Sequence, residues 1–138
     1  MSSAGYMLDT NICIYLIKNN PAHVRTHFER LQPGDILLSS IVLAELMYGV
    51  SKSQHKERNF AALEMFLMPL EIVQFGMHAA EKYGDIRSTL ERSGQLIGGN
   101  DLFIAAHALS LDAILVSNNV KEFIRVPGLR FENWVRKK

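Results

Sequence analysis

Four polar side chains are placed along the sequence so that they could act together on one substrate. Asp9 ends the apolar run that starts at Tyr6, and Glu45 lies one turn into an apolar segment. Asp101 opens a run of small apolar residues, and Asn119 closely follows another apolar run. In open α/β sheets, ligands bind at the carboxyl ends of strands, where such groups can converge. The spacing predicts one polar cluster, built from Asp9, Glu45, Asp101 and Asn119.

A cluster of three carboxylates has a definite chemistry. Like charges in one cleft repel and take up protons unless a cation stabilises them. Glu45 is flanked by Ala44 and Leu46, where an unpaired carboxylate would be costly to bury. Carboxylate oxygens suit Mg²⁺ or Mn²⁺ better than zinc. Such a site lowers the pKa of a bound water, stabilises charge on a phosphoryl oxygen and aligns in-line attack, so we expect metal-assisted hydrolysis of a phosphate ester.

The elements that must position these residues alternate along the chain. Short apolar runs predict strands at residues 6–8, 36–38, 71–75, 113–116 and near 130–131. Apolar residues at helical spacing predict helices at residues 12–17, 21–31, 41–50, 54–67, 76–93 and 102–109. Thr10 or Asn11 is expected to cap the first helix and Ser39 or Ser40 the third. Residues 121–123 are expected to form a short turn. This alternation implies parallel βαβ units in a three-layer α/β/α sandwich with a mostly parallel central sheet.

Length and composition bound the possible classes of protein. With 138 residues, 48% of them apolar, we expect one domain over residues 1–138, with residues 1–5 either a natural extension or an expression remnant. A net charge of +1 excludes a global basic field, so a nucleic acid would have to be bound by local patches. The single Cys13 excludes a disulfide framework, and no apolar run suits a membrane span or signal peptide. We therefore expect a cytoplasmic protein.

The polar residues fall within four sequence blocks, which are MLDTN at 7–11, SIVLAELMYG at 40–49, IGGNDLFIAAHA at 97–108 and LVSNNVKEF at 115–123. These blocks resemble the signature blocks of PIN-domain ribonucleases, and the match is closest to the VapC toxins of bacterial type II toxin–antitoxin modules. The resemblance extends from about Met7 to Trp134. Four blocks in the right order are a specific signal, whereas Asp-Thr-Asn alone would be weak.

The resemblance implies roles for the polar residues. Asp9, Glu45 and Asp101 match the three acidic metal-site positions of the family. Asp9 and Asp101 would be the most direct ligands of Mg²⁺, for which Mn²⁺ can substitute, and Glu45 would hold water or a second ion. Asn119 stands where the family often has Asp. This departure removes one charge and weakens the case for a second tightly held metal, although Asn119 can still position water or phosphate.

The resemblance also implies an activity and partners. Members of the family cleave RNA by metal-dependent hydrolysis, and many cut tRNA or other structured RNA. They form homodimers and are silenced by a VapB-type antitoxin whose C-terminal segment covers the active site, so we expect a larger toxin–antitoxin complex and no membrane partner. Thr10 and Asn11 match positions that support the first Asp by hydrogen bonds.

Each polar residue also has an ordinary structural explanation. Asp9 and Asp101 could be plain helix caps, and Asn119 could be a turn residue with a left-handed backbone. Glu45 could face solvent if its helix is rotated. His107, six residues after Asp101, is expected to be a packed or rim histidine rather than a catalytic base. The joint placement of the four residues at strand-to-helix junctions is what favours a site.

Two other functions are compatible with parts of the pattern. A phosphotransferase with Asp9 as nucleophile would need a second acid two residues later, but position 11 is Asn and no convincing lysine motif follows. A catalytically silent PIN-like module would only bind RNA or protein, and the presence of all three acids argues against it. RNA phosphates would require basic residues near the acids, with Lys121 the first candidate. The segment 65–68, with Met47, is expected to be mostly core, with any exposed part forming a groove for an antitoxin helix.

Overall fold

A single parallel sheet forms the centre of the protein. The computed structural model describes residues 5–135, so most of the uncertain segment 1–5 lies outside the described residues. The sheet has the order β3-β2-β1-β4-β5, and each neighbouring pair is parallel. Its strands are β1 (Tyr6–Leu8), β2 (Ile36–Ser39), β3 (Glu71–Val73), β4 (Ile114–Val116) and β5 (Phe131–Glu132).

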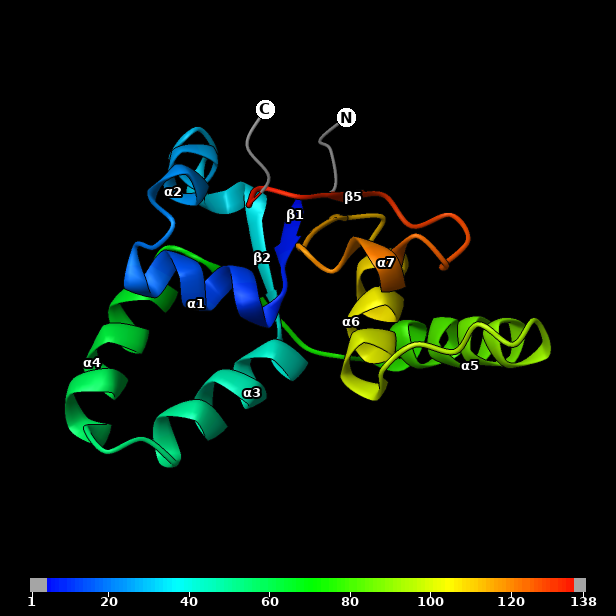
Figure 1. Ribbon diagram of the computed structural model, residues 1–138, viewed down its shortest axis with the longest axis horizontal. Helices are drawn as coiled ribbons and strands as arrows, with labels where there is room; N and C mark the ends of the chain where they lie inside the picture. The colour runs from blue at the N-terminus through cyan, green and yellow to red at the C-terminus, as the bar shows by residue number, and fades with distance from the viewer. Residues whose placement is uncertain (1–4, 136–138) are drawn as a thin grey trace.

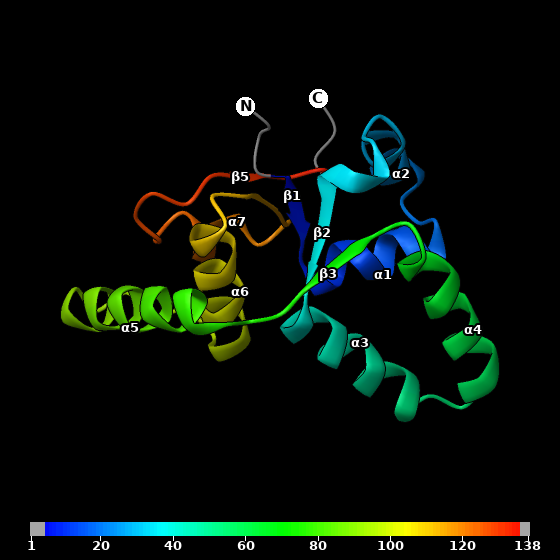
Figure 2. The same ribbon diagram turned by 180° about the vertical axis from the view of Figure 1, so that it is seen from behind.

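Helices connect successive strands and cover both faces of the sheet. Crossovers between parallel strands are right-handed, so the helices that connect β1 to β2 and β2 to β3 lie on one face of the sheet. The helices that connect β3 to β4 and β4 to β5 lie on the other face. Figures 1 and 2 show these two groups on opposite sides of the strands. The helices are α1 (Thr10–Lys18), α2 (Ala22–Glu29), α3 (Ser40–Ser51), α4 (Lys56–Leu67), α5 (Met77–Arg92), α6 (Gly99–Ser110) and α7 (Val120–Phe123), and a 3-10 turn covers Pro33–Asp35. This architecture confirms the predicted three-layer α/β/α sandwich.

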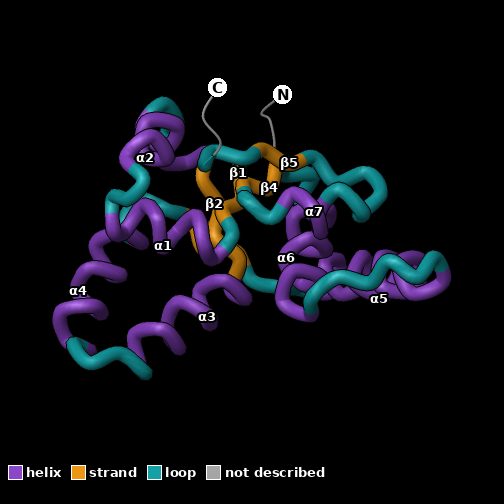
Figure 3. The backbone as a smooth tube through the Cα atoms, viewed as in Figure 1, coloured by secondary structure: helices purple, strands orange, loops and turns teal. Residues whose placement is uncertain are grey.

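Strand β1 is the point where the direction of winding reverses. The chain leaves β1 toward β2 on one side, and β4 pairs with the other side of β1 (Figure 3). Leu8, the last residue of β1, lies level with Val116, the last residue of β4. Since the strands are parallel, their carboxyl ends share one edge, which is where open α/β sheets bind ligands.

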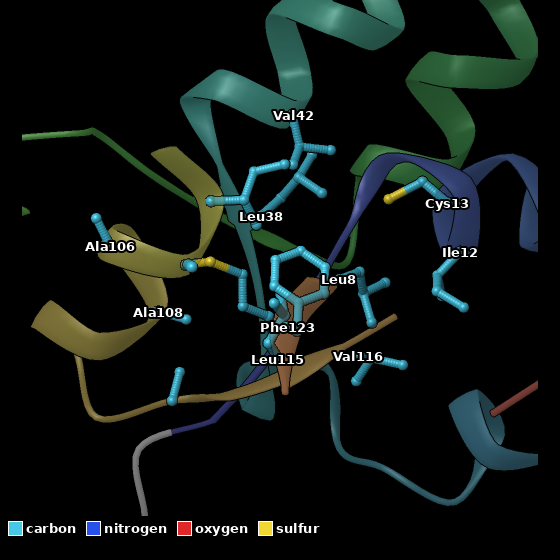
Figure 4. Close-up of a cluster of buried hydrophobic side chains, with 14 of the residues drawn as sticks. Leu8, Ile12, Cys13, Leu38, Val42, Ala106, Ala108, Leu115, Val116 and Phe123 are labelled. Atoms are coloured by element: carbon cyan, nitrogen blue, oxygen red, sulfur yellow. The ribbon is translucent and has the colours of Figure 1, made fainter. Parts of the chain in front are cut away.

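The core lies on both faces of the three inner strands. Leu8, Leu38 and Leu115 are fully buried and pack with Phe123 of α7 (Figure 4). Small residues of α6, including Ala106 and Ala108, are also fully buried, so this helix packs closely against the sheet. Burial of apolar surface of this kind is the main stabilising contribution to folding. The packing of this core fixes the positions of the strand ends from which the polar residues project.

The boundaries of several elements differ from those predicted. Helix α1 is capped by Asp9 and not by Thr10 or Asn11, whereas α3 is capped by Ser39 as one of the two predicted choices. Helix α6 begins at Gly99, before Asp101, so Asp101 lies inside the first turn. The predicted turn near Lys121 is a short helix. These differences amount to a few residues at the ends of elements, where helices fray and boundaries vary.

The methionine-rich segment was predicted to be mostly core, and that prediction is wrong. Met65 and Met68 are 73% and 82% exposed, and Met47 is also exposed. Phe66 and Leu67 are only partly buried against the core. Helix α4 lies at the periphery of the protein (Figure 1), and although its Leu63 is buried, Met65 faces solvent. Within residues 5–135, no helix combines the length and apolar character needed to cross a membrane.

Candidate active site

Asp9 lies at the carboxyl end of β1, in the middle of the sheet edge. Its Oδ1 accepts a hydrogen bond of 2.9 Å from the Ile12 amide, so Asp9 is both a helix cap and a buried acid. Only 5% of the residue is exposed. Burial raises the pKa of Asp9, hydrogen bonds from Ser117 and Ile12 lower it, and the charge of Glu45 raises it, with a net rise. Asp9 is therefore a helix cap, as the ordinary structural explanation proposed. Capping does not account for the whole arrangement, because a helix cap does not need a second acid such as Glu45 nearby.

Glu45 projects from the second turn of α3 toward α1 and α6. Thr10 Oγ1 donates to Glu45 Oε1 at 2.5 Å, and Asn100 Nδ2 donates to Glu45 Oε2 at 2.6 Å. Thr10 was expected to support Asp9, and instead its hydroxyl holds Glu45. The two donors fix the carboxylate at the sheet edge, so the alternative in which Glu45 faces solvent on a rotated helix is wrong.

Asp101 and Asn119 meet at the other side of the edge. Asn119 Nδ2 donates to Asp101 Oδ2 at 2.7 Å, which joins the first turn of α6 to the residue before α7. Asn119 has a φ of −90°, so it is not a turn residue with a left-handed backbone. Ser117 accepts a hydrogen bond from the Asn119 amide and donates to Asp9. Side chains from the ends of β1 and β4 are thereby linked.

Glu122 is a fourth acid of the site, and the sequence reasoning missed it. It lies on α7, where its Oε1 accepts a hydrogen bond of 3.0 Å from the Gly98 amide. Its carboxyl also contacts that of Asp101. The signal in the sequence was an acid three residues after Asn119, at helical spacing, but a turn was expected there. Glu122 supplies a negative charge near the position where the family often has Asp and this chain has Asn.

The Asp101 carboxyl is strongly perturbed. Burial, followed by the hydrogen bond and the charge of Glu122, raises its pKa from 3.8 to about 7, and the charge of Asp9 adds to this rise. The amide of Asn119 acts in the opposite direction. Two carboxyl groups in contact share a proton because they cannot both ionise cheaply at that distance. Near neutral pH, the Asp101 carboxyl beside Glu122 is therefore partly protonated.

The donor chemistry of the cluster fits a hard divalent cation. Its groups are carboxylate and amide oxygens, which bind Mg²⁺ or Mn²⁺. Over residues 5–135, no three acidic, histidine or cysteine side chains are close enough together to enclose an ion. Instead, Glu45 is held by Thr10 and Asn100, and Asp101 by Asn119 and Glu122. A cation bound beside Asp101 would replace the proton that this carboxyl retains because of its raised pKa.

His107 lies away from the acids in a separate buried network. Its Nδ1 is 2.7 Å from Ser39 Oγ, and its ring also bonds to the backbone of Gln74. Ser39 Oγ accepts from the Ile41 amide, so its hydroxyl proton is free to be donated to His107 Nδ1. Burial lowers the pKa of His107 and keeps the ring neutral. The prediction of a packed histidine is confirmed.

Two clefts adjoin the acidic cluster. One, of about 410 Å³, lies between α1, α3 and α4 and has apolar walls with Lys18 and Lys52 at its margin. The other, of about 650 Å³, lies between α1, α3 and α6. Glu45 lines both clefts. A long substrate or a peptide could therefore reach the acids along the surface of α3.

Comparison with known proteins adds a family and relatives. The model of the PIN domain family matches residues 6–129. Ribonuclease VapC2 from Rickettsia felis is 52% identical over 130 residues, covering 94% of this chain and 97% of that protein. The tRNA(fMet)-specific endonuclease VapC of Shigella flexneri is 48% identical over 129 residues, with coverage of 94% and 97%.

Solved structures share the same arrangement of elements. The crystal structure of VapBC2 from Rickettsia felis bound to a DNA fragment from their promoter matches with a TM-score of 0.88 and 50% identity, covering 94% of this chain and 98% of that chain. The crystal structure of DNA-bound VapBC from Salmonella typhimurium matches with a TM-score of 0.89 and 45% identity, with coverage of 94% and 98%. The described fold thus has close structural counterparts.

Proposed function

The chain belongs to the PIN-domain family, among the VapC ribonucleases of toxin–antitoxin systems, and from this premise we propose that it is an Mg²⁺-dependent endoribonuclease that hydrolyses a phosphodiester of structured RNA such as tRNA. The observation that carries the proposal is the meeting of Asp9, Glu45, Asp101 and Glu122 at one edge of the sheet. These acids come from four separate segments. A fold has no structural need to crowd carboxylates in a half-buried place, so their crowding favours a cationic ligand.

Asp9 and Asp101 are the residues we assign to the metal, with Glu45 beside them. When bound, Mg²⁺ supplies a Lewis acid that offsets the charge of the phosphodiester and lowers the pKa of water. Asn119 fixes the orientation of Asp101 by its hydrogen bond, and Ser117 does the same for Asp9. Because these partners hold each carboxylate in place, little reorganisation is needed when the substrate arrives.

Glu45 is the residue we assign to the attacking water. Thr10 donates to one carboxylate oxygen of Glu45 and Asn100 donates to the other. Each oxygen has a further lone pair with which to accept a proton from water. The water oxygen attacks phosphorus, the bond from phosphorus to the leaving oxygen breaks, and that oxygen takes up a proton. Asn100 lies next to Asp101 in the sequence, so the first turn of α6 positions both acids.

We further propose a VapB-type antitoxin and a second copy of the chain as protein partners, in a larger assembly. The support is the apolar cleft between α1, α3 and α4, which Ile17, Leu46 and Leu63 line together with Glu45. A peptide bound there would lie against an active-site acid. The exposed Met65 and Met68 next to this region offer further apolar surface for contact.

The decisive experiment is to express the chain briefly without an antitoxin and to sequence the new RNA ends. We expect wild type to produce a small set of discrete ends, and Asp9→Asn to produce none above background. Purified protein should cleave the same RNA with Mg²⁺ and lose activity in EDTA.

The matched control is Asp85→Asn, which removes an exposed acid on α5 and should leave cleavage unchanged. Equal RNA cleavage by wild type and Asp9→Asn would refute the proposed site. If wild type binds RNA but cleaves none under any divalent metal, the chain is instead a binding module. Formation of a phosphoenzyme would indicate a phosphotransferase.

A further inference from the structure

The face of α3 that carries Glu45 continues as the wall of an open cleft. Residues at helical spacing line this wall, namely Ile41, Ala44, Glu45, Tyr48, Gly49 and, at the C-cap, Lys52. The opposite walls come from α1 and α6, including Asn100 and Phe103. The volume of about 650 Å³ is in the usual range for ligand sites. The cleft is thus continuous with the proposed active site.

Tyr48 is the most exposed aromatic residue lining this cleft. It is 66% exposed, so two thirds of a large side chain remains in solvent although it lies one turn from an active-site acid. Lys52 Nζ is 4.8 Å from the centre of the Tyr48 ring. Lys52 therefore lies over one face of the ring, and an aromatic ring together with a cation is the combination by which proteins bind single-stranded nucleic acid.

Gly49 adds a second, independent observation. A glycine inside a helix weakens it relative to alanine, so its presence needs a reason. Outside its chain neighbours and its own helix backbone, a Cβ built on Gly49 would meet no atom within 4 Å, so no packing against another element requires glycine here. Gly49 lines both clefts and follows Tyr48 in the sequence, so the missing side chain leaves the wall of α3 open at this point.

We propose that Tyr48, Gly49 and Lys52 form a subsite for one unpaired nucleotide of RNA. The base stacks on the Tyr48 ring over the open surface of Gly49, and Lys52 binds a neighbouring phosphate. This subsite rests on the proposed ribonuclease function and adds to it a preference for unpaired nucleotides. A base within a duplex cannot expose its face to a side chain, so cleavage takes place in loops, bulges or ends.

The test measures binding in EDTA, where no cleavage takes place, by the fluorescence anisotropy of labelled RNA. The probes are a 12-nucleotide single strand containing 2-aminopurine and a blunt duplex of the same sequence, with lengths of roughly one binding site. We expect Tyr48→Ala to weaken binding of the single strand about ten-fold or more, and Tyr48→Phe to keep it within about two-fold. The quenching of 2-aminopurine on binding should be lost in Tyr48→Ala only.

A blocking variant tests the same site without removing a contact. Gly49→Leu places its Cβ in open space and favours the helix, so it should preserve the melting temperature while weakening single-strand binding as Tyr48→Ala does. Lys52→Ala should reduce the slope of log affinity against log salt by about 0.7, as expected for one phosphate contact to a single strand, whereas Tyr48→Ala should leave that slope unchanged.

Met47→Ala is the matched control, since Met47 is exposed on the same helix but does not line this cleft. It should bind RNA as wild type does. The proposal is overturned if Tyr48→Ala binds the single strand within two-fold of wild type, if Tyr48→Phe loses as much as Tyr48→Ala, or if Tyr48→Ala weakens only the binding of an antitoxin. Because binding is measured without metal, failure of the proposed cleavage activity would be seen separately.

Discussion

Helix α6 carries two polar clusters of opposite character, one in its first turn and one near its other end. Around His107, donors and acceptors are matched, since the ring bonds to Ser39 on one side and to the backbone of Gln74 on the other. Around Asp101, acceptors outnumber donors, because the Asn119 side chain and the Gly98 N–H face both oxygens of the Asp101 carboxyl and both of the Glu122 carboxyl. A matched buried network needs nothing from outside, whereas a surplus of acceptors needs a proton or a cation. The His107 cluster stabilises the fold, and the Asp101 cluster is the one that we propose binds a cation.

The largest expected effect is on activity, which should depend more strongly on the Asp101 cluster than on the His107 cluster. Asp101→Asn should lower the rate of RNA cleavage with Mg²⁺ by about 10²–10³-fold, because it removes a charge on which transition-state stabilisation depends. The measurement is the initial rate on an RNA identified by end sequencing. Ser39→Ala, in the other cluster, should retain much more activity at a temperature where it stays folded. Similar rates for Asp101→Asn and wild type would remove the distinction.

The next effect separates them by stability. His107→Ala should lower the free energy of unfolding by about 2–4 kcal/mol, because it leaves a cavity and deprives the Ser39 hydroxyl of its buried partner. Urea denaturation followed by circular dichroism measures this loss. His78→Ala removes an exposed histidine of α5 and should change stability by less than about 0.5 kcal/mol. A loss of the same size in both variants would contradict the role of the network.

A smaller effect on stability, a gain and not a loss, is expected for substitution in the acidic cluster. The folded pKa of Asp101 lies above its unfolded value, so the folded state binds the extra proton and loses stability as the pH rises through about 7. In EDTA at pH 8, Asp101→Asn should therefore be more stable than wild type by about 1 kcal/mol, after allowing for solvent screening at this partly exposed site. At pH 5 the gain should have largely disappeared. Destabilisation at pH 8 would show that the acids do not repel each other.

The smallest effect is the pH dependence of the matched cluster. The folded pKa of His107 is lowered, so the unfolded state binds the extra proton, and stability falls as the pH drops below about 6.5 toward the folded pKa. His107→Asn lacks this titration and should show a shallower fall in stability between pH 7 and pH 5.5. Parallel curves for the two proteins would mean that His107 keeps its ordinary pKa when folded.

Much of the fold could be predicted because apolar periodicity reports burial directly. The strands containing Leu8, Leu38 and Leu115 were predicted correctly, as was the order of alternation that makes the sheet parallel. The exposure of Met65 and Met68 could not be predicted, because an apolar side chain carries no mark of whether another element will cover it. Helix α4 lies at the periphery of the protein, and only the three-dimensional arrangement shows this.

The candidate site was predicted in part. Asp9, Glu45, Asp101 and Asn119 do lie at one edge, since the ends of parallel strands share it. Glu122 was missed because the segment after Asn119 was expected to be a turn, and a helix there turns the acid toward Asp101. Whether the acids bind Mg²⁺ stays a prediction.

By itself, the sequence determined which chemical groups stand at the strand ends and how the strands alternate with helices, because these properties depend on residue type and local spacing. Only the tertiary structure decided which polar groups are hydrogen-bonded to each other. Thr10 pairs with Glu45 from 35 positions away, and Gly98 with Glu122 from 24. Such pairings depend on rotamers and on the docking of whole helices, which short-range sequence patterns do not encode. The outward face of α3 with Tyr48 was likewise fixed by packing.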